Sequence, residues 1–142
     1  MEKPDIDENW IRSICENILK DNNQPEAVVT IIFSNDSKLL KLKKEYFDKD
    51  VLTDTISFNL EEEGDPIEGE IYISLERVDK NAQTYNQDFI MECKRVIIHS
   101  CLHLLGFDHE NEEEAEEMES LEIKILADIG IANPYLEGAE TK

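Results

Sequence analysis

The chain has 142 residues, of which 40% are hydrophobic and 34% charged, and its formal net charge is −20. This length fits one domain with its own core, and the periodic apolar residues exclude a disordered chain, while the acidic balance means that any nucleic-acid contact must come from a local basic patch or a bound metal. No apolar run approaches a membrane span and the N-terminus lacks the features of a signal peptide, so we expect a cytoplasmic protein.

A first helix is predicted to begin after Asp7, which can cap it, and to end in the polar run at residues 21–25. Its apolar stripe consists of Ile11, Ile14, Cys15, Ile18 and Leu19. Residues 28–33 then form a β-branched run without alternation, which predicts a strand covered on both faces. We expect this strand at the centre of the sheet.

A second helix is predicted to begin at Ser34 or Asn35 and to bury Leu39, Leu42 and either Tyr46 or Phe47. The order strand, helix, strand predicts a parallel, right-handed crossover. Five lysines on or near this helix form either a basic patch or an ordinary solvated face: Lys38, Lys41, Lys43, Lys44 and Lys49.

Two alternating segments, residues 53–60 and 69–75, flank a charged turn and predict an antiparallel hairpin. In the first segment Ile56, Phe58 and Leu60 share one side, and Thr55, Ser57 and Asn59 share the other. In the second, Ile71, Ile73 and Leu75 are expected to point inward. A helix over about residues 74–85 follows.

All three histidines fall within residues 99–109, on and just after a helix predicted over residues 87–105. This helix is apolar on nearly all sides after residue 96, so we expect it to be the buried central helix. His99 and His103 share a face because positions four apart differ by about 40° around a helix axis. Gly106 is expected to end the helix in the left-handed conformation and to return His109 toward the pair.

Three imidazoles leave a fourth tetrahedral position for water, which is the arrangement of a catalytic zinc ion. Such an ion supplies hydroxide near neutral pH. The alternative is three histidines placed for unrelated reasons, with Gly106 only a helix stop. Metzincin proteases share the spacing, but the glutamate base that follows their first histidine is Ser100 here, so a peptidase loses most of its support.

The three cysteines, Cys15, Cys93 and Cys101, are odd in number and widely spaced, which makes a disulfide framework improbable. Cys101 lies two residues after His99, so it points away from the histidine face. We assign it to core packing rather than to metal binding.

Residues 110–122 contain eight glutamates but also carry an apolar stripe, which predicts an amphipathic helix. The stripe consists of Ala115, Met118, Leu121, Ile125 and Ile129. Gly130 is expected to end the helix, and residues 137–142 to form a frayed tail. The acidic face is interpreted as a solvated surface in preference to a binding surface.

Three stretches together resemble the YbeY family, bacterial endoribonucleases of ribosomal RNA maturation. They are TDTISF at residues 53–58, GEIYIS at 69–74, and VIIHSCLHLLGFDH at 96–109 followed by EAEEM at 114–118. The likeness covers roughly residues 33–135. It implies a single α+β domain over residues 1–142, with a small mixed sheet of three to four strands, about five helices and a metal-binding central helix. It also implies one Zn²⁺ held by His99, His103 and His109.

The resemblance further implies a zinc-dependent single-strand endoribonuclease that matures the 3′ end of small-subunit 16S ribosomal RNA. It implies association with the small ribosomal subunit and with the Era GTPase. Two alternatives stay open, namely a zinc hydrolase of another substrate, such as a peptide, and a non-catalytic ribosome-assembly factor. Candidates for handling the proton are Asp108, Ser57 and Glu70, although Asp108 fits better as a partner that orients a ligand.

The chain departs from the family pattern at several positions. Phe47 stands where the family often has an arginine thought to help bind RNA. Ser100 replaces the usual glycine, Glu70 the usual aspartate and Asn59 the usual proline. Many members also begin with a strand, for which residues 1–6 are too short and polar, so we expect the sheet to lack that edge strand.

Overall fold

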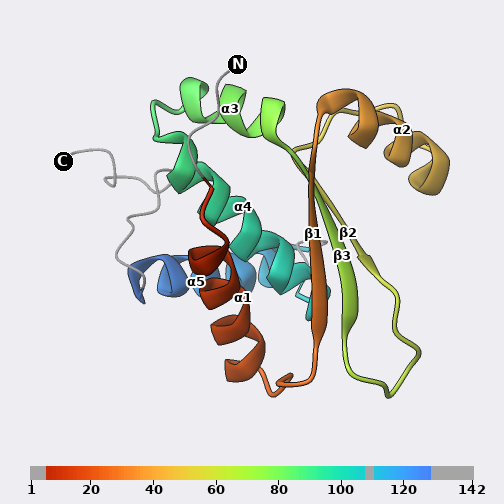
Figure 1. Cartoon of the computed structure of the whole chain (residues 1–142), viewed down its shortest axis with the longest axis vertical. Coiled ribbons are helices and arrows are strands. Elements are labelled where there is room, and N and C mark those ends of the chain that lie inside the picture. Colours follow the sequence, from red (N-terminus) through yellow and green to blue (C-terminus); the bar gives the residue numbers. More distant parts are fainter. Residues whose placement is uncertain (1–5, 108–110, 129–142) are drawn as a thin grey trace.

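The computed structural model describes residues 6–107 and 111–128, which form one α+β domain with five helices and a three-stranded sheet. The elements are α1 (Glu8–Asp21), β1 (Val28–Ser34), α2 (Asp36–Phe47), β2 (Thr55–Asn59), β3 (Glu68–Ser74), α3 (Leu75–Thr84), α4 (Phe89–Leu104) and α5 (Glu112–Asp128). Helices α1 and α4 lie on one side of the sheet and α2 on the other (Figure 1). This architecture confirms the predicted fold class.

The strands are ordered β1-β3-β2, with β1 parallel to β3 and β2 antiparallel to β3. The predicted hairpin of β2 and β3 is therefore confirmed. The prediction that residues 28–33 form the sheet centre is wrong, because β1 is an edge strand and β3 lies in the middle. The predicted parallel crossover from β1 through α2 to the next strand is also wrong, because that strand, β2, runs antiparallel to β3 and is not adjacent to β1, and the strand that pairs in parallel with β1 is β3.

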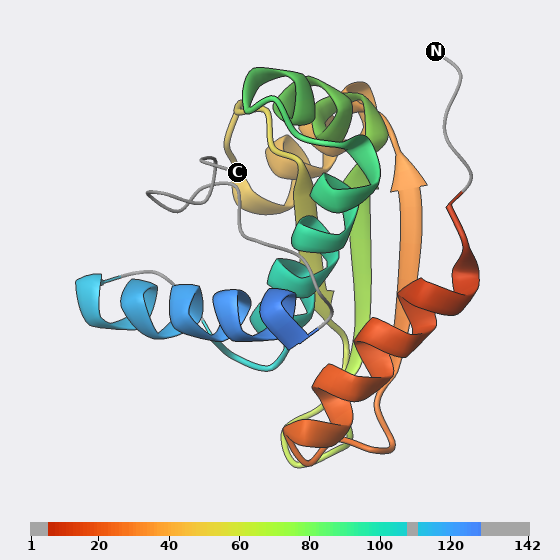
Figure 2. The same ribbon diagram turned by 90° about the vertical axis from the view of Figure 1, so that its left-hand side faces the viewer.

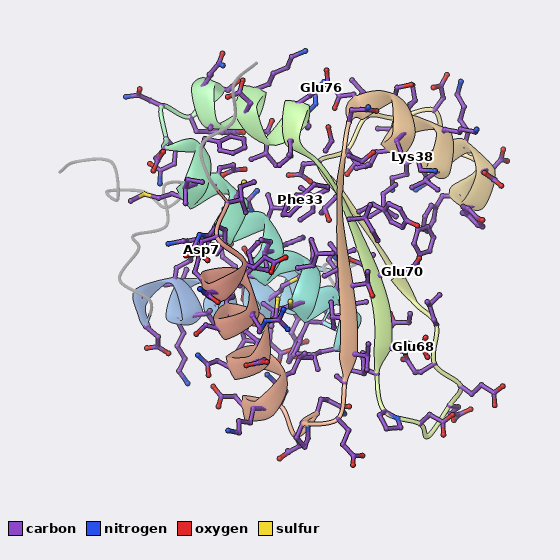
Figure 3. The ribbon with its side chains drawn as sticks, in the orientation of Figure 1. Asp7, Phe33, Lys38, Glu68, Glu70 and Glu76 are labelled. Carbon is purple, nitrogen blue, oxygen red and sulfur yellow. The ribbon has the colours of Figure 1, made fainter. Side chains whose placement is uncertain are left out.

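Edge position also explains why β1 is not covered on both faces. Val29, Ile31 and Phe33 pack against the main core, whereas Val28 is 61% exposed and Thr30 is exposed. Figure 3 shows Phe33 on the side of the sheet where α1 and α4 lie. A β-branched run without alternation is compatible with an edge strand as well as a central one, so local sequence does not distinguish the two.

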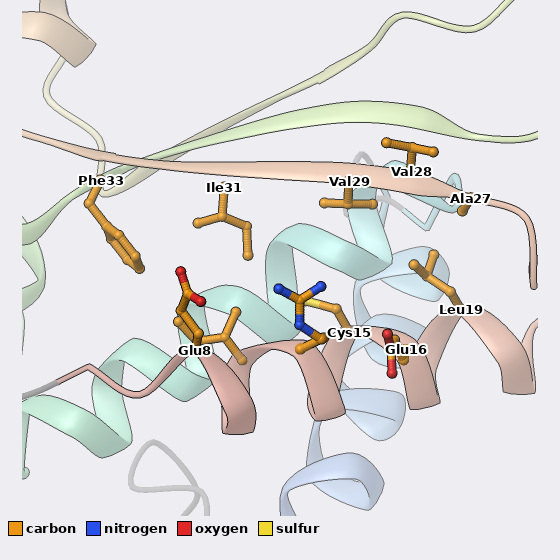
Figure 4. A pocket seen from close by; sticks show the side chains of 11 residues that line it. Glu8, Cys15, Glu16, Leu19, Ala27, Val28, Val29, Ile31 and Phe33 are labelled. Atoms are coloured by element: carbon orange, nitrogen blue, oxygen red, sulfur yellow. The ribbon is translucent and has the colours of Figure 1, made fainter.

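The main core lies between the sheet and helices α1 and α4. Asp7 caps α1, since its Oδ1 accepts a hydrogen bond from the Asn9 backbone N–H at 2.8 Å, as predicted. The α1 residues that are buried are Ile14, Cys15, Ile18 and Leu19, and the core side of β3 is formed by Ile71 and Ile73. Between α1 and the edge strand β1 lies a mostly apolar pocket of about 410 Å³ (Figure 4).

A smaller core lies under α2 on the opposite face, where Leu39, Leu42 and Ile56 are buried against Phe58 and Tyr72. Asn35 caps α2, because its Oδ1 accepts a hydrogen bond from the Lys38 N–H at 2.9 Å.

The prediction that α2 also buries Tyr46 or Phe47 is wrong. Tyr46 is 62% and Phe47 42% exposed. Both rings contact Phe58, but they lie at the end of the helix beside the edge strand β2, where no further helix or strand of residues 6–107 and 111–128 covers them. Leu60, predicted to continue the inward side of β2, lies just beyond the strand and is 49% exposed.

Helix α4 is the buried central helix, as predicted, and it contacts α1, α3, α5 and β2. The helix ends just before Gly106, whose φ of +102° confirms the left-handed conformation that was predicted for it. The Gly106 N–H donates to the His103 carbonyl at 3.0 Å, and the Phe107 N–H donates to the Leu102 carbonyl at 3.1 Å. These two hydrogen bonds are the pair that defines a Schellman motif.

Helix α5 crosses α4 on the side away from the sheet (Figure 2). Met118 and Leu126 are buried there, with Ala115, Leu121 and Ile125 half-buried. Asp108 and His109, together with the predicted helix end near residue 130 and the predicted tail at 137–142, lie outside the described residues. Within the described ranges, none of the helices is both long and apolar enough to cross a membrane.

Candidate metal centre and cleft

His99 and His103 lie one turn apart on α4, with their ring centroids 4.8 Å apart. Both are half-buried and line one wall of a cleft of about 510 Å³. The remaining lining residues come from the end of α2, from β2 and from the segment between them: Lys43, Phe47, Thr53, Asp54, Thr55, Ile56, Ser57 and Asn59. The predicted shared face of the two histidines thus opens into a cavity at the β2 edge of the sheet.

Alternation along β2 places Ser57 in this cleft. Thr55 and Asn59, two residues away on either side, bind α4: the Thr55 Oγ1 lies 2.8 Å from the Ser100 Oγ, and the Asn59 amide donates to the Leu104 carbonyl at 2.9 Å. Ser57 lies between these anchors and faces the same way. The structure therefore brings Ser57, His99 and His103 together, and the catalytic role of Ser57 stays a prediction.

Ser100 links α4 to β2. It is fully buried, and its hydroxyl donates to the Val96 carbonyl at 2.8 Å. Because a hydroxyl has one proton, the 2.8 Å contact with Thr55 requires the Thr55 hydroxyl to donate to Ser100. The residue at the position of the metzincin base thus serves packing and hydrogen bonding between a helix and a strand.

Glu122 supplies the contact behind His99. This carboxylate on α5 accepts a hydrogen bond from the His99 Nδ1, and the residue is 8% exposed. A metal at His99 would then be held by Nε2, and a carboxylate at the other nitrogen fixes the ring orientation and raises its basicity. Sequence reasoning assigned Glu122 to a solvated acidic face. The available signal was its spacing four residues from both Met118 and Leu126, on the buried stripe.

A second unpredicted group, centred on Arg95, lies one turn before His99. The guanidinium binds the fully buried Glu92 through two hydrogen bonds of 3.1 and 3.2 Å. It also lies 3.7 Å from the Asp54 carboxylate in the cleft wall and 4.0 Å from Glu122. One cation therefore connects three carboxylates around the back of the histidine pair.

The donor chemistry at the cleft fits a zinc ion. Two imidazoles on one helix face, one of them backed by a carboxylate, are typical of zinc ligands. Among residues 6–107 and 111–128 there is no group of three or more His, Cys, Asp or Glu side chains that could hold an ion. His109, the third predicted ligand, lies outside those ranges, so the three-histidine set stays a prediction; His99 and His103 lie next to each other in the cleft lining.

Glu70, a sequence candidate for the site, lies on the wrong face of the sheet. In register it pairs with Phe58, which packs under α2, and its Oε1 accepts a 3.3 Å hydrogen bond from the Tyr72 hydroxyl. Figure 3 shows it on the side of α2. Burial and then the nearby Glu70 carboxylate raise the pKa of Tyr72. Register thus separates Glu70 from the cleft.

The predicted lysine patch reaches the cleft through one residue, Lys43. Lys44 forms an exposed ion pair with Asp50 at 3.6 Å, and Lys38, Lys41 and Lys49 are exposed.

Cys101 is fully buried with its Sγ 3.4 Å from the Cys15 Sγ, which confirms its assignment to core packing. The hydrogen bond with Cys15 and then burial raise the pKa of the Cys101 thiol.

Known proteins match this chain over most of its length. The family model described as Endoribonuclease YbeY matches residues 2–130. A relative of that name from Colwellia psychrerythraea is 39% identical over 132 residues, covering 90% of this chain and 84% of the relative. One from Amoebophilus asiaticus is 43% identical over 119 residues, covering 84% of this chain and 78% of the relative.

A solution structure of a protein from Thermotoga maritima superposes with a TM-score of 0.58 at 28% sequence identity, covering 85% of this chain and 82% of that one. The family model and the two relatives therefore agree on one family over most of the chain. The chain belongs to the YbeY family of endoribonucleases.

Proposed function

We propose that this chain is a zinc-dependent endoribonuclease that cleaves single-stranded RNA and matures the 3′ end of small-subunit 16S ribosomal RNA. Family membership makes it a nuclease, a hydrolase of phosphoester bonds. The observation that carries the proposal is the His99 and His103 pair, backed by Glu122 and facing a cleft that also contains Ser57 and Lys43.

The residues of the cleft divide the work as follows. A zinc ion, when bound, would supply Lewis-acid chemistry and would make hydroxide available near neutral pH. His99 and His103 would hold the ion, with Glu122 fixing the His99 ring. The Ser57 hydroxyl, which lines the cleft, would donate a hydrogen bond to a phosphate oxygen, and Lys43 would add positive charge at the α2 side.

The electrostatics of the cleft suit an anionic substrate better than the whole-chain charge of −20 suggests. The carboxylate of Asp54, on the cleft wall, lies 3.7 Å from the Arg95 guanidinium and accepts a 3.4 Å hydrogen bond from the Asn81 amide. Arg95 also binds Glu92 and lies near Glu122, so it offsets the charge of Asp54 only in part, and Lys43 adds a second cation to the cleft lining. Local charge, and not net charge, governs the binding of a phosphate because salt screens charged groups that lie more than about 10 Å away.

The proposed setting is the cytoplasm, where the protein would act on the small ribosomal subunit and with the Era GTPase. The support is the motif resemblance at residues 53–58, 69–74 and 96–118 together with the family match. Asp108 stays a candidate for orienting a ligand or for handling the proton.

The test measures zinc content and RNA cleavage on the same samples of wild type and His103→Ala. We expect His103→Ala to lose most bound zinc and to cleave single-stranded 16S precursor RNA at least 100-fold more slowly. Met91→Ala, on an exposed position at the other end of α4, serves as the matched control. Loss of zinc without any change in cleavage would contradict a metal-dependent nuclease.

Two further readouts separate the alternatives. A zinc-loaded protein that leaves all RNA intact, in cells that accumulate 16S precursor when it is deleted, would indicate a non-catalytic assembly factor. Peptide hydrolysis that depends on added zinc would indicate a peptidase, against which the buried Ser100 argues.

End-group analysis of the cleaved RNA distinguishes attack by water from attack by the ribose 2′-hydroxyl, which leaves a cyclic phosphate.

A further inference from the structure

A cluster of aromatic rings lies beside the cleft and contributes one ring, that of Phe47, to its lining. Four rings form an aromatic cluster in which Phe58 contacts Tyr46, Phe47 and Tyr72, with centroid separations of 5.3, 5.9 and 5.9 Å. Phe47 stacks on Phe58 at an interplanar angle of 25°. Its position is thus held by a second ring that is itself anchored under α2.

Phe47 is the member of this cluster that reaches the cleft. It lines the same cavity as His99, His103 and Ser57, and it is 42% exposed. An exposed phenyl ring leaves apolar surface in water, and large exposed aromatic residues beside a cavity commonly mark a binding surface. A ligand that covers this ring would remove that surface from water within reach of the candidate metal centre.

A positive charge accompanies the ring. The Lys43 Nζ lies 4.8 Å from the Phe47 centroid, and Lys43 lines the cleft one helical turn earlier on α2. In a chain of net charge −20, a cation held beside an exposed aromatic ring and a cavity matches a partner that is planar and anionic. Nucleic-acid single strands combine these properties, because each nucleotide carries a π-face and a phosphate.

We propose that Phe47 is a stacking platform for an unpaired base of single-stranded RNA, and that Lys43 contacts a neighbouring phosphate. This inference rests on the proposed ribonuclease function and adds the substrate feature that its cleft selects. The flexible Lys43 side chain lets its ammonium group move from the Phe47 ring to an RNA phosphate when a base stacks on that ring. Paired bases have both faces covered by their neighbours, so the platform favours unpaired segments next to the histidine pair.

Equilibrium binding of short fluorescent oligonucleotides with 2′-O-methyl ribose, which lack the free 2′-hydroxyl, tests this proposal. Phe47→Leu keeps apolar volume but removes the aromatic face, and we expect its Kd for a single strand to rise about 5- to 20-fold, the lower part of the range for a stacked base because the ring stays partly exposed. Phe47→Trp should bind at least as tightly as wild type. The matched control is Tyr46→Leu, an exposed ring on the same helix that does not line the cleft, with a change below about twofold.

A strand that carries abasic sites at every position should bind wild type and Phe47→Leu equally, because it has no base to stack. Lys43→Ala should lower the slope of log Kd against log salt by about 1. Thermal melting of each variant shows whether it is folded at the temperature of the titration.

Three results overturn the inference: an unchanged Kd for Phe47→Leu, an equal loss for intact and abasic strands, or a wild-type dimer that Phe47→Leu makes monomeric without any change in RNA binding. The last would make the ring an interface between copies of the chain. RNA cleavage by the wild type together with an unchanged Kd for Phe47→Leu removes the platform but leaves the nuclease, whereas Phe47-dependent binding without cleavage removes the nuclease but leaves the platform.

Discussion

The Glu122 carboxylate on α5 accepts a hydrogen bond from the Nδ1 of His99 on α4, across 23 residues of sequence. The contact joins the most acidic helix of the chain to the histidine pair, and it is backed by Arg95, which lies 4.0 Å from the other Glu122 oxygen. The acidic helix therefore contributes one specific carboxylate to the candidate metal centre while its other face meets solvent.

Glu122→Ala is expected to weaken zinc binding about 10- to 100-fold, the usual effect of removing a partner that orients a ligand. Glu122→Gln, which keeps an acceptor oxygen but not the charge, should weaken it less. Competition with a chelating dye measures both affinities. Glu119→Ala, an exposed glutamate on the same helix, is the control and should bind zinc as wild type does. Equal affinities for Glu122→Ala and wild type would contradict this role for Glu122.

Replacing Arg95 tests the buried charge network. Arg95→Met leaves the fully buried Glu92 without its two hydrogen bonds, so we expect the free energy of unfolding to fall by about 3–5 kcal/mol. The double variant Arg95→Met with Glu92→Gln also removes the buried negative charge and should recover part of the loss. Urea denaturation measures both. An Arg95→Met protein as stable as wild type would show that the pair is dispensable.

Gly69 sets how closely α4 approaches β3. A Cβ at this position would lie 2.7 Å from both terminal carbons of Leu104, which is itself 3% exposed and has little room to move. Gly69→Ala is expected to reduce the free energy of unfolding by about 1–3 kcal/mol through overpacking. In a double-mutant cycle with Leu104→Ala the Gly69→Ala cost should shrink. A full additive cost would show that the clash does not involve Leu104.

The Asp36 carboxylate joins the start of α2 to α3, accepting hydrogen bonds of 2.7 Å from the Ser74 hydroxyl and 2.8 Å from Arg77. Burial acts to raise the pKa of Asp36, but the bonds from Ser74 and Arg77 outweigh it and hold that pKa below its usual value. Because the folded-state pKa is lowered, the stabilisation is present above the usual aspartate pKa of about 4 and is lost as the pH falls through the folded value.

Asp36→Asn should therefore lower the free energy of unfolding by about 1–2 kcal/mol at pH 7, and the difference from wild type should diminish as the pH falls below about 4. Denaturation curves across this pH range measure the change. Asp50→Asn, an aspartate whose side chain is 73% exposed, should behave as wild type at all of these pH values. A constant difference for Asp36→Asn across the range would exclude an ionic contribution.

Local sequence was enough to predict features that depend on residues close together in the chain. The shared face of His99 and His103 follows from helix geometry, and the left-handed Gly106 from the end of an apolar run. The alternation in residues 53–60 and 69–75 likewise predicted the hairpin of β2 and β3. Each of these patterns is stabilised by hydrogen bonds or periodicity within one element or between neighbours.

Tertiary structure decided the rest, because it depends on which distant surfaces cover one another. The strand order β1-β3-β2 puts residues 28–33 at an edge of the sheet. The register of β2 and β3 puts Ser57 in the cleft and Glu70 on the opposite face of the sheet. The packing of α5 across α4 selected Glu122 from eight glutamates at residues 110–122, and the end of α2 left Phe47 exposed at the cleft. These pairings are set by non-local burial, whose free energy no single segment of sequence contains.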